Sequence, residues 1–199
     1  MKLLYSPASP FARKVRVLVH EKGSADKVSY VPTTTMDNPA ELLSANPLGR
    51  IPTLIMPNGQ NVIESDVICA FLDDLLPGRK LIPAESAAHW DCLYRQGLGD
   101  GVMESAVRLI QEKNRPENER SLLWMSRWKD AIIRSVVTLE AGVKESAQEP
   151  DLGDIAIACA FGYIDFRHKE IDWRSHAPRL AAWYAAISAR ASFMESNPA

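Results

Sequence analysis

The stretch from residue 49 to residue 66 constrains the fold of this chain more than any other. It has an apolar, β-branched run at 51–56, then Pro-Asn-Gly-Gln at 57–60, then a shorter apolar run at 61–63. Proline presets φ, and asparagine and glycine tolerate positive φ, so 57–60 predicts a turn between two antiparallel strands. Ser65 is the predicted N-cap of the helix that follows. The apolar stripe of this amphipathic helix is Val67, Ile68, Phe71, Leu72 and Leu75.

The end of this stretch is suited to binding a doubly charged group. The first turn of a helix carries unpaired N–H groups and a partial positive charge, so it can hold a carboxylate. Glu64, directly before Ser65, offers a negative partner for an ammonium group. Together the two residues can bind both charges of a free α-amino acid head group. The alternative interpretation is that Ser65 only caps the helix and Glu64 is only solvated.

The N-terminal residues predict a strand, a helix and a second strand. Residues 2–5 are strand-like. In the predicted helix, Ser9 stands at the N-cap, Pro10 at the first helical position and Gly23 just past the end. Residues 28–31 predict the second strand. A strand, helix and strand in about thirty residues predict a parallel pair with a right-handed crossover.

The remaining patterns predict two domains of different class. A short helix over 38–43 completes a βαβαββα order in residues 1–77, which is typical of a thioredoxin-like domain. Proline and glycine residues predict a linker over 78–85. Residues 86–199 show only helical periodicity, which predicts an all-helical bundle. The chain is therefore predicted to be an α+β domain followed by an all-α domain.

Two features stand out in the predicted helical domain. Asp151 can cap a helix, and Asp154 can reach back to it in a capping box. The residues that follow are apolar almost all round, so this helix is predicted to be central and buried. A kink or a close helix contact is predicted at the three glycines of the first long helix, Gly97, Gly99 and Gly101.

Composition excludes several classes of function. The net charge is −2, which gives no electrostatic reason to expect a nucleic acid or an anionic membrane as partner. We find no signal peptide and no apolar run near the ~20 residues that span a bilayer, so a cytoplasmic protein is expected. Cys69, Cys92 and Cys159 are odd in number and widely spaced, which predicts buried thiols and not disulfides. No spacing of histidine, cysteine and carboxylate residues suggests a metal site.

Along its whole length the chain resembles the glutathione S-transferase family. The resemblance implies a cytoplasmic homodimer that acts in detoxification, takes glutathione as co-substrate and needs no metal. Ser9-Pro10-Phe11 is similar to the active-site motif of serine-type classes such as tau, and to the omega motif with serine in place of cysteine. The other motifs that carry the resemblance are residues 46–50, Ile51-Pro52, Glu64-Ser65 and the Asp151-x-x-Asp154 cap.

The resemblance implies a role for each of five residues. Ser9 would donate its hydroxyl to the glutathione sulfur, or it would only cap the helix. Glu64 and Ser65 would bind the γ-glutamyl head. Ile51, before a cis Pro52, would offer backbone hydrogen bonds to the cysteinyl part.

The resemblance suggests roles for four further residues, and three of them have an alternative interpretation. Arg50 would bind the glycine carboxylate or be solvated at the surface. Arg13 would support Glu64 from one turn into the first helix. Asp100 would reach the glutathione amine across a dimer interface, or be a polar residue at a helix kink. Tyr5 is a rival hydroxyl donor, with packing under the helix as the alternative.

The leading hypothesis is a glutathione S-transferase acting on small hydrophobic electrophiles. One alternative is a glutathione-dependent disulfide or peroxide reductase. Reduction through a protein thiol is disfavoured, because Ser9 stands where the resemblance implies a redox cysteine and Ala12 stands at the second redox position. The other alternative is a non-catalytic binding or regulatory module on the same fold. An electrophile pocket is expected between the domains, lined by Phe11, Met103, Val107 and the loop near Trp173.

Overall fold

The computed structural model of the chain describes residues 1–143 and 148–198. These residues form two compact units, one of residues 1–89 together with 191–198, and one of residues 90–143 together with 148–190. The strands of the described residues all lie in the first unit, and the second unit is helical. The predicted combination of an α+β part and an all-helical part is therefore confirmed.

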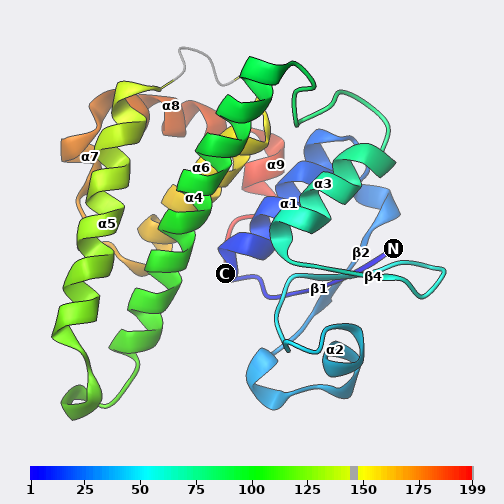
Figure 1. Cartoon of the computed structure of the whole chain (residues 1–199), viewed down its shortest axis with the longest axis horizontal. Coiled ribbons are helices and arrows are strands. Elements are labelled where there is room, and N and C mark those ends of the chain that lie inside the picture. Colours follow the sequence, from blue (N-terminus) through cyan, green and yellow to red (C-terminus); the bar gives the residue numbers. More distant parts are fainter. Residues whose placement is uncertain (144–147, 199) are drawn as a thin grey trace. The chain divides into compact units, whose positions relative to one another are not determined.

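A four-stranded sheet in the order β2-β1-β3-β4 forms the centre of the first unit (Figure 1). β1 (Lys2–Tyr5) pairs in parallel with β2 (Ser29–Pro32). On its other side β1 pairs antiparallel with β3 (Thr53–Ile55), which pairs antiparallel with β4 (Asn61–Ile63). Both the predicted parallel crossover and the predicted hairpin are present.

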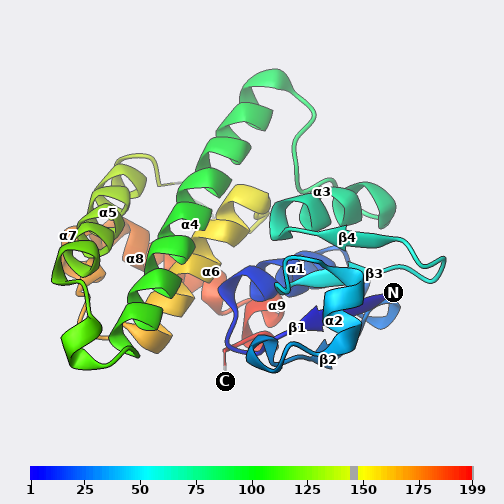
Figure 2. The same ribbon diagram turned by 60° about the horizontal axis from the view of Figure 1, so that its bottom comes forward.

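Helices cover both faces of this sheet. α1 (Pro10–Glu21) and α3 (Ser65–Leu75) pack against each other on one face, and α2 (Ala40–Ala45) lies on the other (Figure 2). The last helix, α9 (Ala191–Met194), packs on α1. Two 3₁₀ turns, Ala25–Lys27 and Thr35–Asp37, join the elements. The fully buried core of this unit includes Leu3, Leu4, Val15, Leu18, Leu54, Ile68 and Leu72.

The start of α3 differs from the prediction by one residue. Glu64, and not Ser65, is the N-cap, and Ser65 is the first helical residue. Only Glu64 separates β4 from α3, so this residue alone must turn the chain, and its backbone takes φ +65° and ψ 127°. A non-glycine residue in that region stores about 1–3 kcal/mol of strain, which is often found at functional sites.

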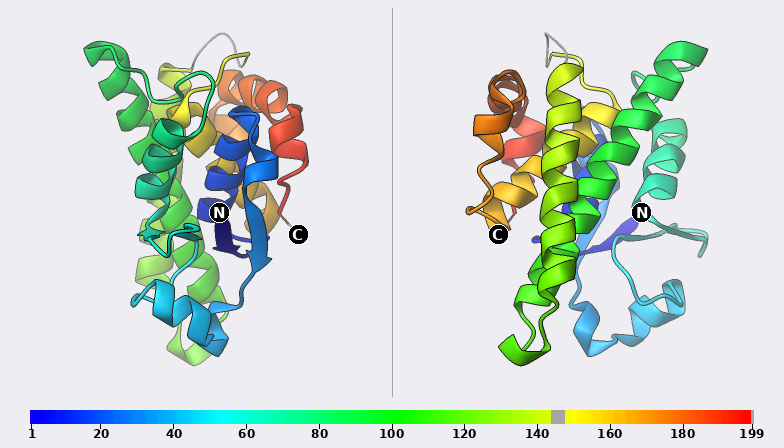
Figure 3. Two further views of the ribbon diagram at one scale, coloured as in Figure 1. Left: turned by 90° about the vertical axis from the view of Figure 1, so that its right-hand side faces the viewer. Right: turned by 60° about the vertical axis from the view of Figure 1, so that its left-hand side comes forward.

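The second unit contains five helices in the part of the chain that the structure describes (Figure 3). α8 (Pro178–Ser188) contacts three others of them, α5 (Leu122–Ala141), α6 (Leu152–Arg167) and α7 (Trp173–His176). α4 (Ser86–Lys113) is one uninterrupted helix, whose first residues belong to the first unit. A short 3₁₀ turn, Glu117–Glu119, follows α4.

The centre of the second unit is α6, as predicted. Its residues 152–164 are all buried. A Cβ atom added at Gly99 of α4 would stand 2.7 Å from the carbonyl carbon of Ala156, so glycine permits a close contact between α4 and α6. Gly97 and Gly101 are exposed and have no neighbour at that range. The predicted close helix contact is thus made by Gly99.

Two negative findings apply to the described residues. None of their helices has the length and apolar character needed to cross a bilayer. Across residues 1–143 and 148–198, no cluster of three or more histidine, cysteine or acidic side chains is arranged to hold a metal ion. Cys69, Cys92 and Cys159 are free thiols, and all three are buried.

Candidate functional site

Three segments that the sequence analysis singled out meet at one end of the sheet. The strand register places Leu4 of β1 beside Thr53 of β3, and Thr53 beside Ile63 of β4. The C-terminal ends of β1 and β4 therefore adjoin the N-terminal end of β3. The segments beyond these three ends are the turn that leads to Ser9, the Ile51–Pro52 pair, and Glu64–Ser65.

Two helix N-termini lie at this same end of the sheet. α1 begins after the turn that follows β1, and α3 begins directly after β4 (Figure 2). Each N-terminus presents backbone N–H groups and a partial positive charge of the helix dipole. The site is therefore suited to a ligand that carries two separated anionic groups.

Ser9 is the N-cap of α1, and its Oγ accepts a hydrogen bond from the backbone N–H of Ala12 at 3.2 Å. The side chain is half-buried. Accepting this bond uses an oxygen lone pair and leaves the hydroxyl proton available to donate. Capping α1 and donating to a ligand are therefore compatible roles of one hydroxyl.

Glu64 and Arg50 form an exposed ion pair at this end of the sheet. The guanidinium Nη1 of Arg50 lies 3.9 Å from Oε1 of Glu64, and both side chains are more than half exposed. Ser65 is buried, and its Oγ lies 3.5 Å from Oδ1 of Asp66. The Glu64 carboxylate is therefore accessible to a ligand, while the Ser65 hydroxyl sits in the protected start of α3.

The backbone around residue 51 is held by neighbouring side chains. The Ile51–Pro52 peptide bond is cis, as the family resemblance implied. The carbonyl of Arg50 accepts hydrogen bonds from Asn46 Nδ2 at 3.0 Å and from Thr53 Oγ1 at 2.7 Å. Asn46 and Thr53 are buried, so these bonds are protected from water. Asn46 belongs to the 46–50 motif that carries the family resemblance, but its contact with this backbone was not predicted.

The position of Arg13 corrects one expectation. Its Nη2 donates to the carbonyl of Phe193 at 3.0 Å and to Oδ1 of Asn197 at 2.9 Å, and its Nε donates to Oγ of Ser196 at 3.4 Å. Arg13 thus binds the C-terminal segment and does not support Glu64. The reason is geometric, since the face of α1 that bears Arg13 meets α9.

Lys14, the next residue of α1, is the residue that reaches α3. Successive helix positions are rotated by about 100°, so neighbouring residues point in different directions. Lys14 is fully buried, and its ammonium forms an ion pair with the carboxylate of Asp66 in the first turn of α3. No local sequence pattern indicated a role for Lys14. The only available signal was an acidic residue at the start of α3, 52 positions away.

Tyr5 packs under the first helix. Its ring forms an edge-on contact with Tyr30 at 5.8 Å between centroids. The guanidinium of Arg16 lies over both rings, at 5.2 Å and 5.6 Å. This packing accounts for Tyr5 without a role in ligand binding.

Asp151 and Asp154 form the predicted capping box and also bind a buried arginine. The carboxylate of Asp151 accepts from the backbone N–H of Asp154 at 3.0 Å, and Asp154 accepts from that of Asp151 at 3.1 Å. Arg95 Nη1 lies 2.9 Å from Asp151 Oδ1 and 2.7 Å from Asp154 Oδ1. Burial opposes the charged guanidinium, but the two carboxylates raise the pKa of Arg95 above its ordinary value.

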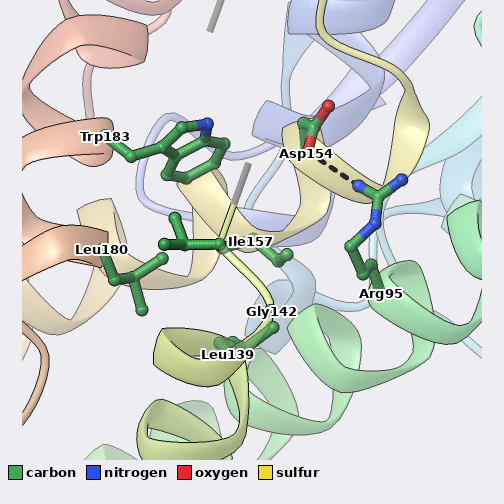
Figure 4. Close-up of a pocket in the computed structure, with 8 residues that line it drawn as sticks. Arg95, Leu139, Gly142, Asp154, Ile157, Leu180 and Trp183 are labelled. Carbon is green, nitrogen blue, oxygen red and sulfur yellow. Dashed lines mark hydrogen bonds and ion pairs between the residues drawn. The ribbon is translucent and has the colours of Figure 1, made fainter. Parts of the chain in front are cut away.

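A small cavity adjoins this cluster (Figure 4). Its volume is about 20 Å³, which is room for about one water molecule and too little for an organic ligand. The residues that line the cavity are Arg95, Leu139, Gly142, Val143, Asp154, Ile157, Leu180 and Trp183.

The thiol of Cys92 also lies near the Asp151 carboxylate. Burial and this carboxylate raise the pKa of the Cys92 thiol to about 11, so the thiol is protonated at neutral pH.

Trp173 is a core residue and not part of a loop open to ligands. Its ring is fully buried and stacks on Phe161 with 4.2 Å between centroids. Its indole N–H donates to Oδ1 of Asp165 at 2.9 Å. Residues 173–176 form α7, which folds the indole back onto α6. The other residues expected in the electrophile pocket are Phe11 on α1 and Met103 and Val107 on α4, and their role there stays a prediction. Asp100, expected to reach the glutathione amine, is half-buried on α4, and its role also stays a prediction.

Comparison with family models identifies both parts of the chain. Residues 8–75 match the model of the glutathione S-transferase N-terminal domain. Residues 123–186 match the model of the glutathione S-transferase C-terminal domain. The first match contains Ser9, Ile51–Pro52 and Glu64–Ser65, and the second contains Asp151 and Asp154.

Individual relatives match over nearly the whole chain. The uncharacterized GST-like protein YibF of Escherichia coli K12 is 29% identical over 202 residues, which covers 100% of this chain and 98% of that protein. Glutathione S-transferase omega-1 of Sus scrofa is 32% identical over 182 residues, which covers 89% of this chain and 72% of that protein. A crystal structure of a glutathione transferase family member from Pseudomonas fluorescens Pf-5, with bound glutathione, is 38% identical, with a TM-score of 0.94 over 100% of this chain and 98% of that one.

Proposed function

The chain belongs to the glutathione S-transferase family, and we propose that it binds glutathione and activates its thiol for attack on small hydrophobic electrophiles. One observation carries this proposal. The strand register brings the segments that contain Ser9, Ile51 and Glu64–Ser65 to one end of the sheet, where two helices begin. The related structure from Pseudomonas fluorescens, which contains glutathione, supports the choice of ligand.

In this proposal the ends of the tripeptide bind to different segments. The exposed Glu64 carboxylate pairs with the α-ammonium of the γ-glutamyl head, and the start of α3 at Ser65 binds its α-carboxylate. The backbone of Ile51 bonds the cysteinyl part. Arg50 binds the glycine carboxylate in exchange for its long contact with Glu64.

Thiol activation is an energetic requirement that the site can meet. A free thiol with a pKa near ~8.5 is only about 3% thiolate at pH 7. Lowering that pKa by about 2 units gives about three quarters thiolate and requires roughly 2.7 kcal/mol of preferential interaction with the anion. A charge-assisted hydrogen bond from Ser9 and the N-terminus of α1 can together supply this amount.

Ser9 acts in this mechanism as a hydrogen-bond donor and not as a base. Its hydroxyl keeps its proton and donates it toward the sulfur, while the thiol proton passes to water. The thiolate then forms the sulfur–carbon bond to the electrophile, and the electrophile's leaving group departs with its electron pair. Holding both reactants in place supplies the rest of the rate increase.

The buried thiols favour this function over reduction through a protein cysteine. Such a reductase needs an accessible thiolate to form a mixed disulfide. All three cysteines are buried, and the pKa of Cys92 is raised to about 11. Disulfide or peroxide reduction through bound glutathione itself, and a non-catalytic glutathione-binding role, are the alternatives that activity assays separate.

The proposal extends to organisation and location. We assign residues 1–77 to the glutathione-binding domain, 78–85 to a linker and 86–199 to the helical domain, of which α9 packs on α1 in the first compact unit. A cytoplasmic homodimer is proposed, in which Asp100 of one subunit reaches the glutathione amine bound to the other. A monomer in light scattering would remove this role from Asp100.

Calorimetric titration with glutathione, followed by assay of its conjugation to a chloronitrobenzene, tests the proposed function. Binding of glutathione together with conjugation supports a transferase. Binding with disulfide or peroxide reduction and no conjugation supports the reductase alternative. Binding without any turnover supports a regulatory module, and absence of binding contradicts all three.

A further inference from the structure

The proposed reaction needs α1 and α3 to hold a defined spacing, because α1 presents Ser9 and α3 presents Ser65. We propose that Lys14 and Asp66 are the positioning residues that set this spacing. The inference rests on the proposed function, in which one glutathione molecule spans both helix starts. Neither residue needs to touch the ligand for this role.

The contact joins the two helices close to the site. Lys14 lies five positions after Ser9 in α1, and its side chain is fully buried. Its ammonium pairs with Oδ1 of Asp66. Asp66 directly follows Ser65, and its Oδ1 lies 3.5 Å from the Ser65 hydroxyl. The pair therefore links two parts of the proposed site. One is the helix whose N-cap, Ser9, donates a hydrogen bond to the glutathione sulfur, and the other is the turn that binds the γ-glutamyl head.

A buried lysine is a costly way to pack two helices. Removing an ammonium from water costs several kcal/mol, which an ion pair offsets only with good geometry. Most residues packed between the helices are apolar, with Leu18 of α1 and Ile68 and Leu72 of α3 fully buried. A second buried ion pair, Lys22–Asp73 at 3.0 Å, joins the C-terminal end of α1 to α3. Apolar contact is non-directional, whereas an ion pair fixes one arrangement of the groups that it joins. Lys22 and Asp73 lie away from Ser9 and Ser65, so Lys14–Asp66 is the ion pair that fixes the spacing of the helices beside the site. The lysine thus contributes a defined arrangement more than it contributes stability.

Another face of α1 is held by hydrogen bonds to the C-terminal segment. Arg13 binds the C-terminal segment, and Arg16 Nη2 donates to the carbonyl of Glu195 at 3.0 Å. These contacts restrain α1 against α9. Lys22 fixes the C-terminal end of α1 against Asp73 of α3, and Lys14 fixes the part of α1 nearer to Ser9 against the start of α3. A displacement of about 1 Å between reacting groups can cost as much as 10²-fold in rate. Loss of the pair should therefore affect thiol activation more than the binding of the γ-glutamyl head.

Three variants test the proposal: Lys14→Met, Asp66→Asn and the double variant. The thiolate absorbance of bound glutathione gives the pKa of its thiol as pH is varied. If the pair positions α1, each variant raises this pKa by about half a unit or more. Each also lowers kcat for conjugation by about three- to tenfold and changes the Kd for glutathione by less than about threefold.

The direction of the change separates positioning from a direct effect of charge on the sulfur. Losing the positive Lys14 by itself would raise the thiol pKa through the electric field, and losing the negative Asp66 would lower it. The double variant would then resemble the wild type. Positioning predicts an increase in all three variants. Opposite shifts in the two single variants, or a double variant that matches the wild type, would overturn the proposal.

Control variants distinguish positioning from general loss of structure. Lys2→Met removes an exposed lysine–carboxylate pair with Glu41 in the same unit, and it should leave the thiol pKa unchanged. Lys14→Arg keeps the charge and should restore most of kcat. Asp66→Asn leaves a buried ammonium and can unfold the protein, in which case Lys14→Met and the double variant decide, since neither leaves that charge behind. Circular dichroism confirms folding.

The wild type separates failure of this inference from failure of the proposed function. If wild-type protein binds no glutathione, or binds it with an unchanged thiol pKa, the proposed function itself is wrong. If the wild type lowers the thiol pKa and all three variants do so equally, only the role of Lys14 and Asp66 is overturned.

Discussion

Arg95 of α4 donates hydrogen bonds to both oxygens of the Asp151 carboxylate, with Nη1 2.9 Å from Oδ1 and Nη2 2.5 Å from Oδ2. The same carboxylate caps α6, so a single arginine supports the start of a helix whose residues 152–164 are all buried. Asp154 shares this guanidinium. The cluster thus joins α4 to α6 through buried polar contacts.

Replacing Arg95 by Met is expected to destabilise the protein by about 3 kcal/mol or more, because it leaves two buried carboxylates without their cation. Chemical denaturation measures this change. The matched control is Arg108→Met on the same helix, which removes an exposed pair with Glu104. Its effect should be within about 0.5 kcal/mol. Equal losses in the two variants would show that the buried cluster has no special importance.

Substitutions of Ser9 separate its capping role from its proposed role in catalysis. Ser9→Ala removes both the cap and the donor, and Ser9→Gly removes the donor at a cap cost of only a few tenths of a kcal/mol. Ser9→Asp keeps a strong N-cap but places a carboxylate where the thiolate should form. All three should bring kcat/KM for conjugation down by about tenfold or more, since each loses the hydroxyl.

Stability should follow a different order in the same three proteins. The cost should be about 1 kcal/mol for Ser9→Ala and smaller for the other two. Thermal unfolding and conjugation rates, measured together, check both orders. If conjugation rate followed stability across the series, Ser9 would be only a helix cap.

Glu64 is predicted to combine backbone strain with ligand binding. Glycine adopts positive φ at little cost, so Glu64→Gly should be more stable than Glu64→Ala by about 1 kcal/mol or more. Both variants lose the carboxylate and should bind glutathione about tenfold more weakly or worse, because a charged hydrogen-bond partner is missing. Thermal unfolding and calorimetry are the measurements. Unchanged affinity in both variants would remove Glu64 from the site.

A buried histidine should give the stability a distinct pH dependence. Burial lowers the pKa of His168, whose Nε2 lies 2.8 Å from the carbonyl of Ala106 and whose Nδ1 lies 3.0 Å from the ammonium of Lys113. The folded protein therefore resists protonation at this residue. As pH falls below the ordinary histidine value of about 6.5, the unfolded state binds a proton that the folded state does not.

Stability should consequently decline on acidification by as much as about 1.4 kcal/mol per pH unit from this one group. In His168→Gln the decline between about pH 6.5 and 5 should be shallower than in the wild type. Urea denaturation at several pH values measures both slopes. Identical slopes would assign the acid sensitivity to other residues.

Local sequence patterns predicted the fold well where the cause is local. The limits of α1 follow from Ser9, Pro10 and Gly23, and the capping box of α6 follows from two aspartates three residues apart. The β3–β4 turn likewise follows from its proline, asparagine and glycine. In each case the residues that decide the structure are neighbours in the chain, so the sequence contains the interaction.

Long-range partners could not be predicted in this way. Arg13 and Lys14 are adjacent and both cationic, yet one binds residues 180 or more positions away and the other binds Asp66. Their choice depends on how the faces of α1 meet α9 and α3. The helix start at Glu64 was missed by one residue because a one-residue connection overrides the preference of Ser65 for the cap position.

The most direct test of the account is a crystal structure with glutathione bound. We expect the γ-glutamyl head to lie at Glu64 and Ser65, and the sulfur to lie within about 3.5 Å of Ser9 Oγ, the range of a hydrogen bond. A molecule bound elsewhere, or a sulfur that lies beyond reach of Ser9, would contradict it.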